Sequence, residues 1–99
     1  SFNFISKHTE SFLMTDKNLV YKRLKIQSWR RGMKEMDLIL GKFSDFSLRE
    51  LSEKQLEAYE SLMLENDQTL FSWFSKQAAV PVDFVDIVEM ISKTIETKV

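Results

Sequence analysis

The chain has 99 residues, with 14 Lys and Arg against 15 Asp and Glu, one histidine and no cysteine. This length fits a single domain, and the absence of cysteine excludes disulfides, thiolate nucleophiles and sulfur-ligated zinc. Its apolar runs stay far below the ~20 residues that span a bilayer, so we expect a soluble protein.

Residues 1–13 have a weak pattern and include His8, the only histidine. They lack both the basic start and the long apolar run of a secretory signal. We interpret them as an N-terminal tail or added leader, with Met14 as a candidate natural start. Residues 14–99 are then expected to form one helical domain, and His8 is expected to be a solvated tail residue.

Two helices separated by Gly32 are predicted first along the chain. One covers about 17–31, with Thr15 or Asp16 as its N-cap. The other covers about 33–43, and Gly41 is expected to fray its last turn. The apolar positions repeat at helical spacing and define the expected buried stripes: Val20, Leu24 and Ser28 flanked by Tyr21 and Trp29, then Met33, Met36, Leu40 and Phe43.

Three further helices are predicted in the second half of the chain. Ser52 and Gln55 form a capping-box pattern in front of a helix over 53–65, with Asn66 as its left-handed end. Asp67 is the expected cap of a helix over 68–77, whose LFSWF run should be core. Asp83 is the expected cap of a helix over 84–97, after Pro81. The stripes are Leu56, Tyr59, Leu62 and Met63, then Phe84, Val88, Ile91 and Ile95.

The chain contains only two glycines and one proline, and no sustained alternation of Val, Ile and Thr. Strands are therefore not expected. The sequence predicts an all-α fold, a compact bundle of about five short helices.

The segment RRGMKEMD, Arg30 to Asp37, carries the most functional information. A glycine between two helices allows a positive φ and a sharp turn, which would leave Arg31 and Glu35 at a corner. There, Arg31 offers a fork of donors, while Glu35 and Asp37 accept hydrogen bonds. The alternative is structural: Arg31 and Glu35 form an i,i+4 pair or cap the second helix.

The same segment contains an RGxxE motif with an acidic residue two places later, and it resembles the SdhE-type FAD assembly factors. The LILGKF run and the acidic-then-LFSWF segment from Asp67 to Phe74 strengthen the resemblance, which covers about Leu19 to Ile95. Gln27 departs from it, because many members have a basic residue there. The resemblance implies that Arg31, Gly32, Glu35, Asp37, Arg30 and Trp29 contact a partner.

What the resemblance implies about function is a non-enzymatic assembly factor. It would bind the flavoprotein subunit of succinate dehydrogenase, and its relative fumarate reductase, and promote covalent attachment of FAD to that subunit. The FAD and the bond-forming residues would belong to the partner, so no cofactor is expected on this chain. We expect a monomer in the bacterial cytoplasm, or in the mitochondrial matrix if the source is eukaryotic.

Charge is distributed unevenly, since residues 16–49 are basic and residues 50–99 are acidic. Either the two halves attract each other within the fold, or the basic half forms a face for an acidic partner. The basic residues also support a second hypothesis, a helical nucleic-acid-binding module that contacts phosphates through Arg23, Lys25, Arg30, Arg31 and Lys34. A third class, an enzyme, lacks a credible nucleophile and base.

Overall fold

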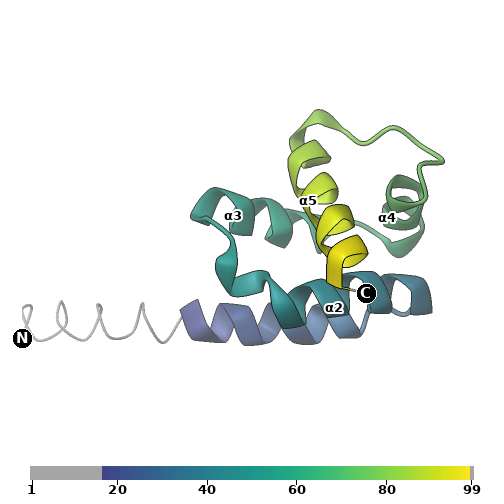
Figure 1. Cartoon of the computed structure of the whole chain (residues 1–99). Coiled ribbons are helices and arrows are strands. Elements are labelled where there is room, and N and C mark those ends of the chain that lie inside the picture. The colour runs from purple at the N-terminus through teal and green to yellow at the C-terminus, as the bar shows by residue number, and fades with distance from the viewer. Residues whose placement is uncertain (1–16, 99) are drawn as a thin grey trace, which may run out of the picture.

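The computed structural model describes residues 17–98, and within that range the chain is helical and has no strand (Figure 1). A first helix runs through residues 17–29 and is followed by α2 (Lys34–Phe46), the short 3₁₀ helix η1 (Leu48–Glu50), α3 (Glu53–Leu62), α4 (Asp67–Phe74) and α5 (Val82–Lys98). These are the five α-helices of the described part of the chain. The predicted all-α bundle is therefore confirmed.

The first helix and α2 form an antiparallel hairpin, which lies along the lower edge of the view in Figure 1. Their contacts fix the register, because Trp29 lies against Gly41 and Lys25 pairs with Asp45. Helix α5 packs across α2 and also contacts α3 and α4. The hairpin is thus the base on which the other three helices rest.

The core consists largely of the predicted stripes. Fully or almost fully buried side chains come from every helix: Leu24, Met36, Leu40, Phe43, Leu56, Tyr59, Leu62, Leu70, Trp73, Val88 and Ile91. Trp73 of the LFSWF run is buried, whereas Phe71 and Phe74 are only partly buried. Because these side chains repeat every three or four residues, helix formation and burial reinforce each other.

The best local prediction was the start of α3. The Ser52 side chain accepts from the Gln55 N–H at 3.2 Å, and the Gln55 side chain accepts from the Ser52 N–H at 2.9 Å. Leu51 and Leu56, on either side of this box, are both buried. Two otherwise unpaired N–H groups are satisfied in this way. Because both partners lie within four residues, the motif can be predicted from the sequence.

Several predicted boundaries and caps were wrong. The first helix ends at residue 29 instead of 31, and α3 ends at Leu62 instead of Glu65. Asn66 does not adopt the left-handed conformation (φ −78°); its side chain instead caps α4 by accepting from the Thr69 N–H. Asp67 is consequently the first residue of that helix.

The remaining corrections concern α4, α5 and the end of α2. Helix α4 ends at Phe74 instead of residue 77, and α5 begins at Val82, so Asp83 lies in its first turn instead of capping it. Helix α2 continues past the predicted end at Phe43 to Phe46, and η1 was not predicted. The expected tail, His8, Met14 and the Thr15 or Asp16 cap lie outside the described residues.

Candidate functional site

The RGxxE segment forms the turn of the helix hairpin. The first helix closes with a hydrogen bond from the Arg30 N–H to the Gln27 carbonyl, and α2 opens at Lys34. Gly32, between them, has a φ of +97° and is exposed. The predicted positive φ at this glycine is confirmed, and it lets the chain reverse direction within four residues.

The Arg31 side chain points into the protein, away from solvent. Its Nε donates to Asp67 Oδ1 at 2.7 Å, Nη1 donates to the Met63 carbonyl at 2.8 Å, and Nη2 donates to the Glu65 carbonyl. Only 11% of the side chain is exposed. We call Arg31, Asp67 and these two carbonyls the Arg31 latch.

The latch satisfies backbone groups that a helix leaves unpaired. Met63 and Glu65 lie just beyond the end of α3, where carbonyls lack intrahelical partners. Asp67 opens α4, where a carboxylate is favoured by the helix dipole. Arg31 therefore ties the hairpin turn to the connection between α3 and α4. The sequence predicted Asp67 as a helix cap and as the first residue of the acidic-then-LFSWF segment, but it did not predict the pairing of Asp67 with Arg31.

Asp37 and Glu35 have different environments although both lie in the first turn of α2. The half-buried Asp37 accepts from the Arg31 N–H at 2.6 Å, so its carboxylate braces the turn. Glu35 is exposed, and its side chain makes no hydrogen bond or ion pair with residues 17–96. Arg31 pairs with Asp67 instead of Glu35, so the i,i+4 pair considered from sequence does not form.

Trp29 fixes the distance between the two helices of the hairpin. A Cβ built on Gly41 would overlap three carbons of the indole, and even the most distant of them would be only 2.7 Å away. The ring therefore lies flat over Gly41, and its Nε1 donates to Asp45 Oδ1 at 3.1 Å. Gly41 is needed for this close approach, so the predicted fraying of α2 at Gly41 was wrong.

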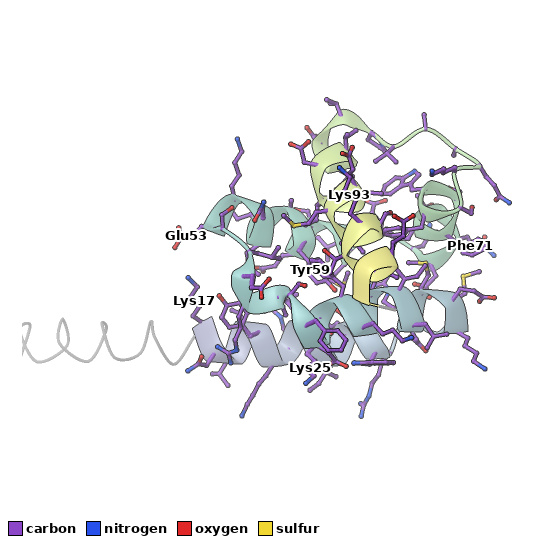
Figure 2. All side chains as sticks on the ribbon, viewed as in Figure 1. Lys17, Lys25, Glu53, Tyr59, Phe71 and Lys93 are labelled. Atoms are coloured by element: carbon purple, nitrogen blue, oxygen red, sulfur yellow. The ribbon has the colours of Figure 1, made fainter. Side chains whose placement is uncertain are left out.

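A buried polar pair joins the hairpin to α3. The Ser28 hydroxyl donates to the Leu24 carbonyl at 2.6 Å, and the Ser28 and Tyr59 hydroxyl oxygens are 2.5 Å apart. Tyr59 lies at the centre of the molecule (Figure 2). Burial raises the pKa of its phenol above the ordinary value, against the opposing effects of the Ser28 hydrogen bond and the Arg31 charge. Sequence reasoning placed both residues on apolar stripes and missed the pair.

The basic residues of the second hypothesis do not form one free face. Arg23 pairs with Glu60 at 3.0 Å, Lys25 with Asp45 at 3.4 Å, and Arg31 with Asp67. Arg30 and Lys34 are exposed and have no such pair in the described part of the chain. Two of these pairs, Arg23–Glu60 and Arg31–Asp67, join the basic and the acidic half of the sequence, so the halves do attract each other within the fold. Some cations still make no ion pair with the described residues.

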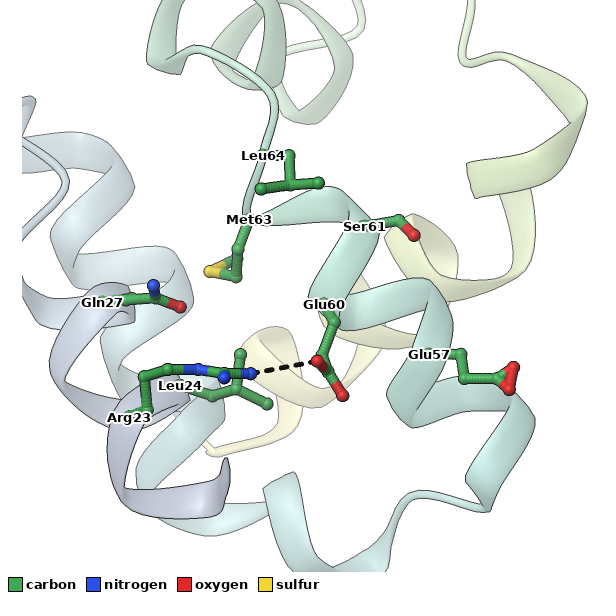
Figure 3. Close-up of a pocket in the computed structure, with 8 residues that line it drawn as sticks. All are labelled: Arg23, Leu24, Gln27, Glu57, Glu60, Ser61, Met63 and Leu64. Atoms are coloured by element: carbon green, nitrogen blue, oxygen red, sulfur yellow. Dashed lines mark hydrogen bonds and ion pairs between the residues drawn. The ribbon is translucent and has the colours of Figure 1, made fainter. Parts of the chain in front are cut away.

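A hollow lies between the first helix and α3 (Figure 3). It has a volume of about 630 Å³, is open to solvent and is crossed by the Arg23–Glu60 ion pair. Its lining is mixed: Arg23, Leu24, Gln27, Glu57, Glu60, Ser61, Met63 and Leu64. Across residues 17–98, no cluster of three or more His, Cys, Asp or Glu side chains is placed to hold a metal ion. No described helix is long and apolar enough to cross a membrane.

Comparison with known proteins places this architecture in a family. The family model described as "flavinator of succinate dehydrogenase" matches residues 22–95. A Dictyostelium discoideum protein named succinate dehydrogenase assembly factor 2, mitochondrial, is 43% identical over 64% of this chain, which corresponds to 45% of its own length. The FAD assembly factor SdhE of Legionella pneumophila (strain Lens) is 37% identical over 63% of this chain and 78% of its own length.

The chain thus spans less than half of the slime-mould relative but most of the bacterial one. No solved structure matches the chain. The matched region, residues 22–95, takes in the hairpin turn, the Arg31 latch, helices α2 to α4 and most of the first helix and of α5. The chain therefore belongs to the family of succinate dehydrogenase flavinators, the SdhE-type FAD assembly factors.

Proposed function

We propose that this protein binds the flavoprotein subunit of succinate dehydrogenase, and that of fumarate reductase, and promotes the covalent attachment of FAD. Membership of the flavinator family supports the assembly role. The observation that carries the proposal is the hairpin turn, where Gly32 and Glu35 face solvent on a backbone held by Arg31 and Asp37. A rigid exposed corner, with an acceptor that the described residues leave unpaired, is suited to a specific protein contact.

The exposed residues of the turn would make the direct contacts. Glu35 would accept a hydrogen bond from a donor on the partner, and Gly32 would allow the partner's surface to approach the backbone closely. Arg30 and the outer edge of Trp29, which is 37% exposed, would extend the contact. Arg31 and Asp37 would serve the same site from inside by keeping the turn in shape.

The chemistry would belong to the partner. In this proposal FAD and the residue that forms the covalent bond lie on the flavoprotein, and this chain binds one arrangement of that subunit better than others. Such differential binding shifts the population toward the reactive arrangement. The protein would act where its partner is assembled, in the bacterial cytoplasm or the mitochondrial matrix.

The test is flavin attachment to the purified flavoprotein subunit, followed by in-gel flavin fluorescence with and without this protein. Glu35→Ala should stay folded and reduce covalent flavin strongly, because a donor on the partner would be left unpaired at a cost of about 1 to 3 kcal/mol. Gly32→Arg should abolish attachment by blocking the approach of the partner and by straining the turn, because few residues with a side chain adopt the φ of +97° found at Gly32. Thermal melting of this variant separates the two causes.

Glu57→Ala is the matched control, since Glu57 is also an exposed acidic residue and lies on α3, outside the turn. It should leave flavin attachment at the wild-type level. Full activity of a folded Glu35→Ala variant would remove the turn from the mechanism, and a wild-type protein without effect on covalent flavin would refute the proposed function.

A further inference from the structure

The outer side of the hairpin carries cations that make no ion pair with the residues that the structure describes. Lys22 and Arg30 on the first helix, and Lys34 and Lys42 on α2, make no ion pair within the described residues. Lys17, Arg23, Lys25 and Arg31, in contrast, each pair with a carboxylate: Glu53, Glu60, Asp45 and Asp67. Internal attraction therefore accounts for only part of the basic half of the sequence.

These four cations share one surface with exposed apolar side chains. Lys22, Ile26 and Trp29 follow one another at i, i+4 and i+7 on the first helix, and Lys34, Leu38 and Lys42 are spaced by four on α2. The two rows are adjacent because Trp29 lies on Gly41. We call these six residues together with Arg30 the hairpin face. Ile26 is 53% and Leu38 41% exposed, so apolar area is available between the charges.

We propose that the hairpin face is a docking surface for an acidic protein surface with apolar patches, located on the flavoprotein subunit. This inference rests on the proposed function and extends it beyond the turn to the length of the two helices. Unpaired cations favour a partner of opposite charge, and the apolar side chains between them supply the area that is removed from water.

A protein partner fits this face better than a membrane or a nucleic acid. Trp29 lies flat on Gly41 and is hydrogen-bonded to Asp45, so its ring does not project for insertion between lipids. The exposed carboxylates of Glu35 and Asp45 border the same face, and the net charge of the chain is −1. Both features oppose binding to a continuous row of phosphates.

Charge reversal away from the turn tests the proposal. Lys22 and Lys42 are each ten residues from Gly32, so Lys22→Glu/Lys42→Glu changes the face and leaves the turn intact. Binding to the purified flavoprotein subunit would be measured by surface plasmon resonance at low and high salt. We expect Kd to rise roughly tenfold at low salt, mainly through slower association, and the difference to shrink at high salt.

Lys54→Glu/Lys76→Glu is the matched control, because it makes the same charge change at exposed lysines outside the hairpin. Its Kd should stay within about twofold of the wild type. In a second pair, Ile26→Gln/Leu38→Gln should weaken binding several-fold through faster dissociation at any salt concentration, whereas Leu64→Gln/Val82→Gln should not. Circular dichroism verifies that each variant is folded.

The outcomes separate this inference from the function on which it rests. If the wild type binds the flavoprotein and Lys22→Glu/Lys42→Glu binds it equally well, the hairpin face is not a docking surface. The turn then remains as the site. A wild-type protein that does not bind the flavoprotein refutes the proposed function itself. The wild type could instead form a dimer, or bind phosphatidylserine vesicles or duplex DNA. If Lys22→Glu/Lys42→Glu loses one of these properties and keeps flavoprotein binding, the inference is also overturned.

Discussion

Replacing Arg31 with alanine should destabilise the fold more than any exposed substitution in the hairpin. The change removes the donors to Asp67 Oδ1 and to the Met63 and Glu65 carbonyls. It also leaves the Asp67 carboxylate, whose side chain is only 18% exposed, without its counter-charge. The connection between α3 and α4 would then lose its attachment to the hairpin.

The size of the effect follows from this geometry. Removing one member of a buried ion pair costs about 3 to 5 kcal/mol, and water entering the space left by Arg31 favours the lower end. A loss of about 3 kcal/mol is a large part of the 5 to 15 kcal/mol typical of a folded domain. At about 4 to 8 °C per kcal/mol for a domain of this size, Arg31→Ala should lower Tm by roughly 12 to 24 °C.

Thermal and urea unfolding followed by circular dichroism would measure this change. Arg30→Ala is the control, because Arg30 is the adjacent arginine but is exposed and unpaired within the described residues, so its effect should stay within about 0.5 kcal/mol. Asp67→Asn keeps an oxygen opposite Arg31 but removes the counter-charge, so it should cost about 1.5 to 3 kcal/mol. The Arg31→Ala/Asp67→Ala double variant should be less destabilised than the sum of the two single variants.

An Arg31→Ala protein that melts within a few degrees of the wild type would refute the latch. Arg31 would then be free to contact a partner directly, as its place in the RGxxE motif suggests. If the Tm of Arg31→Ala is instead much lower than that of the wild type, any loss of flavin attachment in this variant is explained by displacement of the turn. Arg31→Lys distinguishes the two roles further, since it keeps the charge but loses the fork that reaches three acceptors.

Three other substitutions test separate parts of the fold by thermal melting. Gly41→Ala should destabilise by roughly 1 to 3 kcal/mol although alanine is the better helix former, because the new Cβ overlaps the Trp29 ring; an unchanged Tm would contradict the close approach. Tyr59→Phe should cost about 1 kcal/mol at neutral pH by removing the hydrogen bond to Ser28. Because burial raises the pKa of Tyr59, the folded state keeps a proton that the unfolded state loses above pH ~10. The free energy of unfolding of the wild type should therefore fall by up to about 1.4 kcal/mol per pH unit above that pH. Tyr59→Phe should reduce this slope, and equal slopes would refute the explanation. Ser52→Ala removes half of the capping box and should cost about 1 kcal/mol, whereas no loss would mean that α3 starts without it.

The candidate site shows where local signals are sufficient and where they are not. The positive φ at Gly32 could be predicted, because two helical patterns met at a glycine and few other residues allow such a reversal. The direction of the Arg31 side chain could not. Its partners come from residues 63–67, more than thirty positions away, and no local pattern distinguishes an arginine that faces a partner from one that ties two loops together.

The role of Gly41 also could not be predicted from local sequence. Helix propensity alone treats a glycine inside a helix as a weak point, yet here the missing side chain makes room for the Trp29 ring. The contact also explains why Trp29, which lies among exposed charged and apolar side chains of the hairpin, is only partly exposed. Propensity describes one chain segment at a time, whereas packing is a property of two.

The sequence by itself determined the helical class, the buried stripes, the capping box at Ser52 and the family resemblance carried by the RGxxE segment. These features depend on residues within one or two helical turns of each other, so their physical causes are visible locally. The tertiary structure decided which charged side chains form ion pairs within the protein and which remain exposed on its surface. Arg31 pairs with Asp67, and Glu35 makes no ion pair with the described residues, because ion pairs form between elements that meet only when the chain has folded.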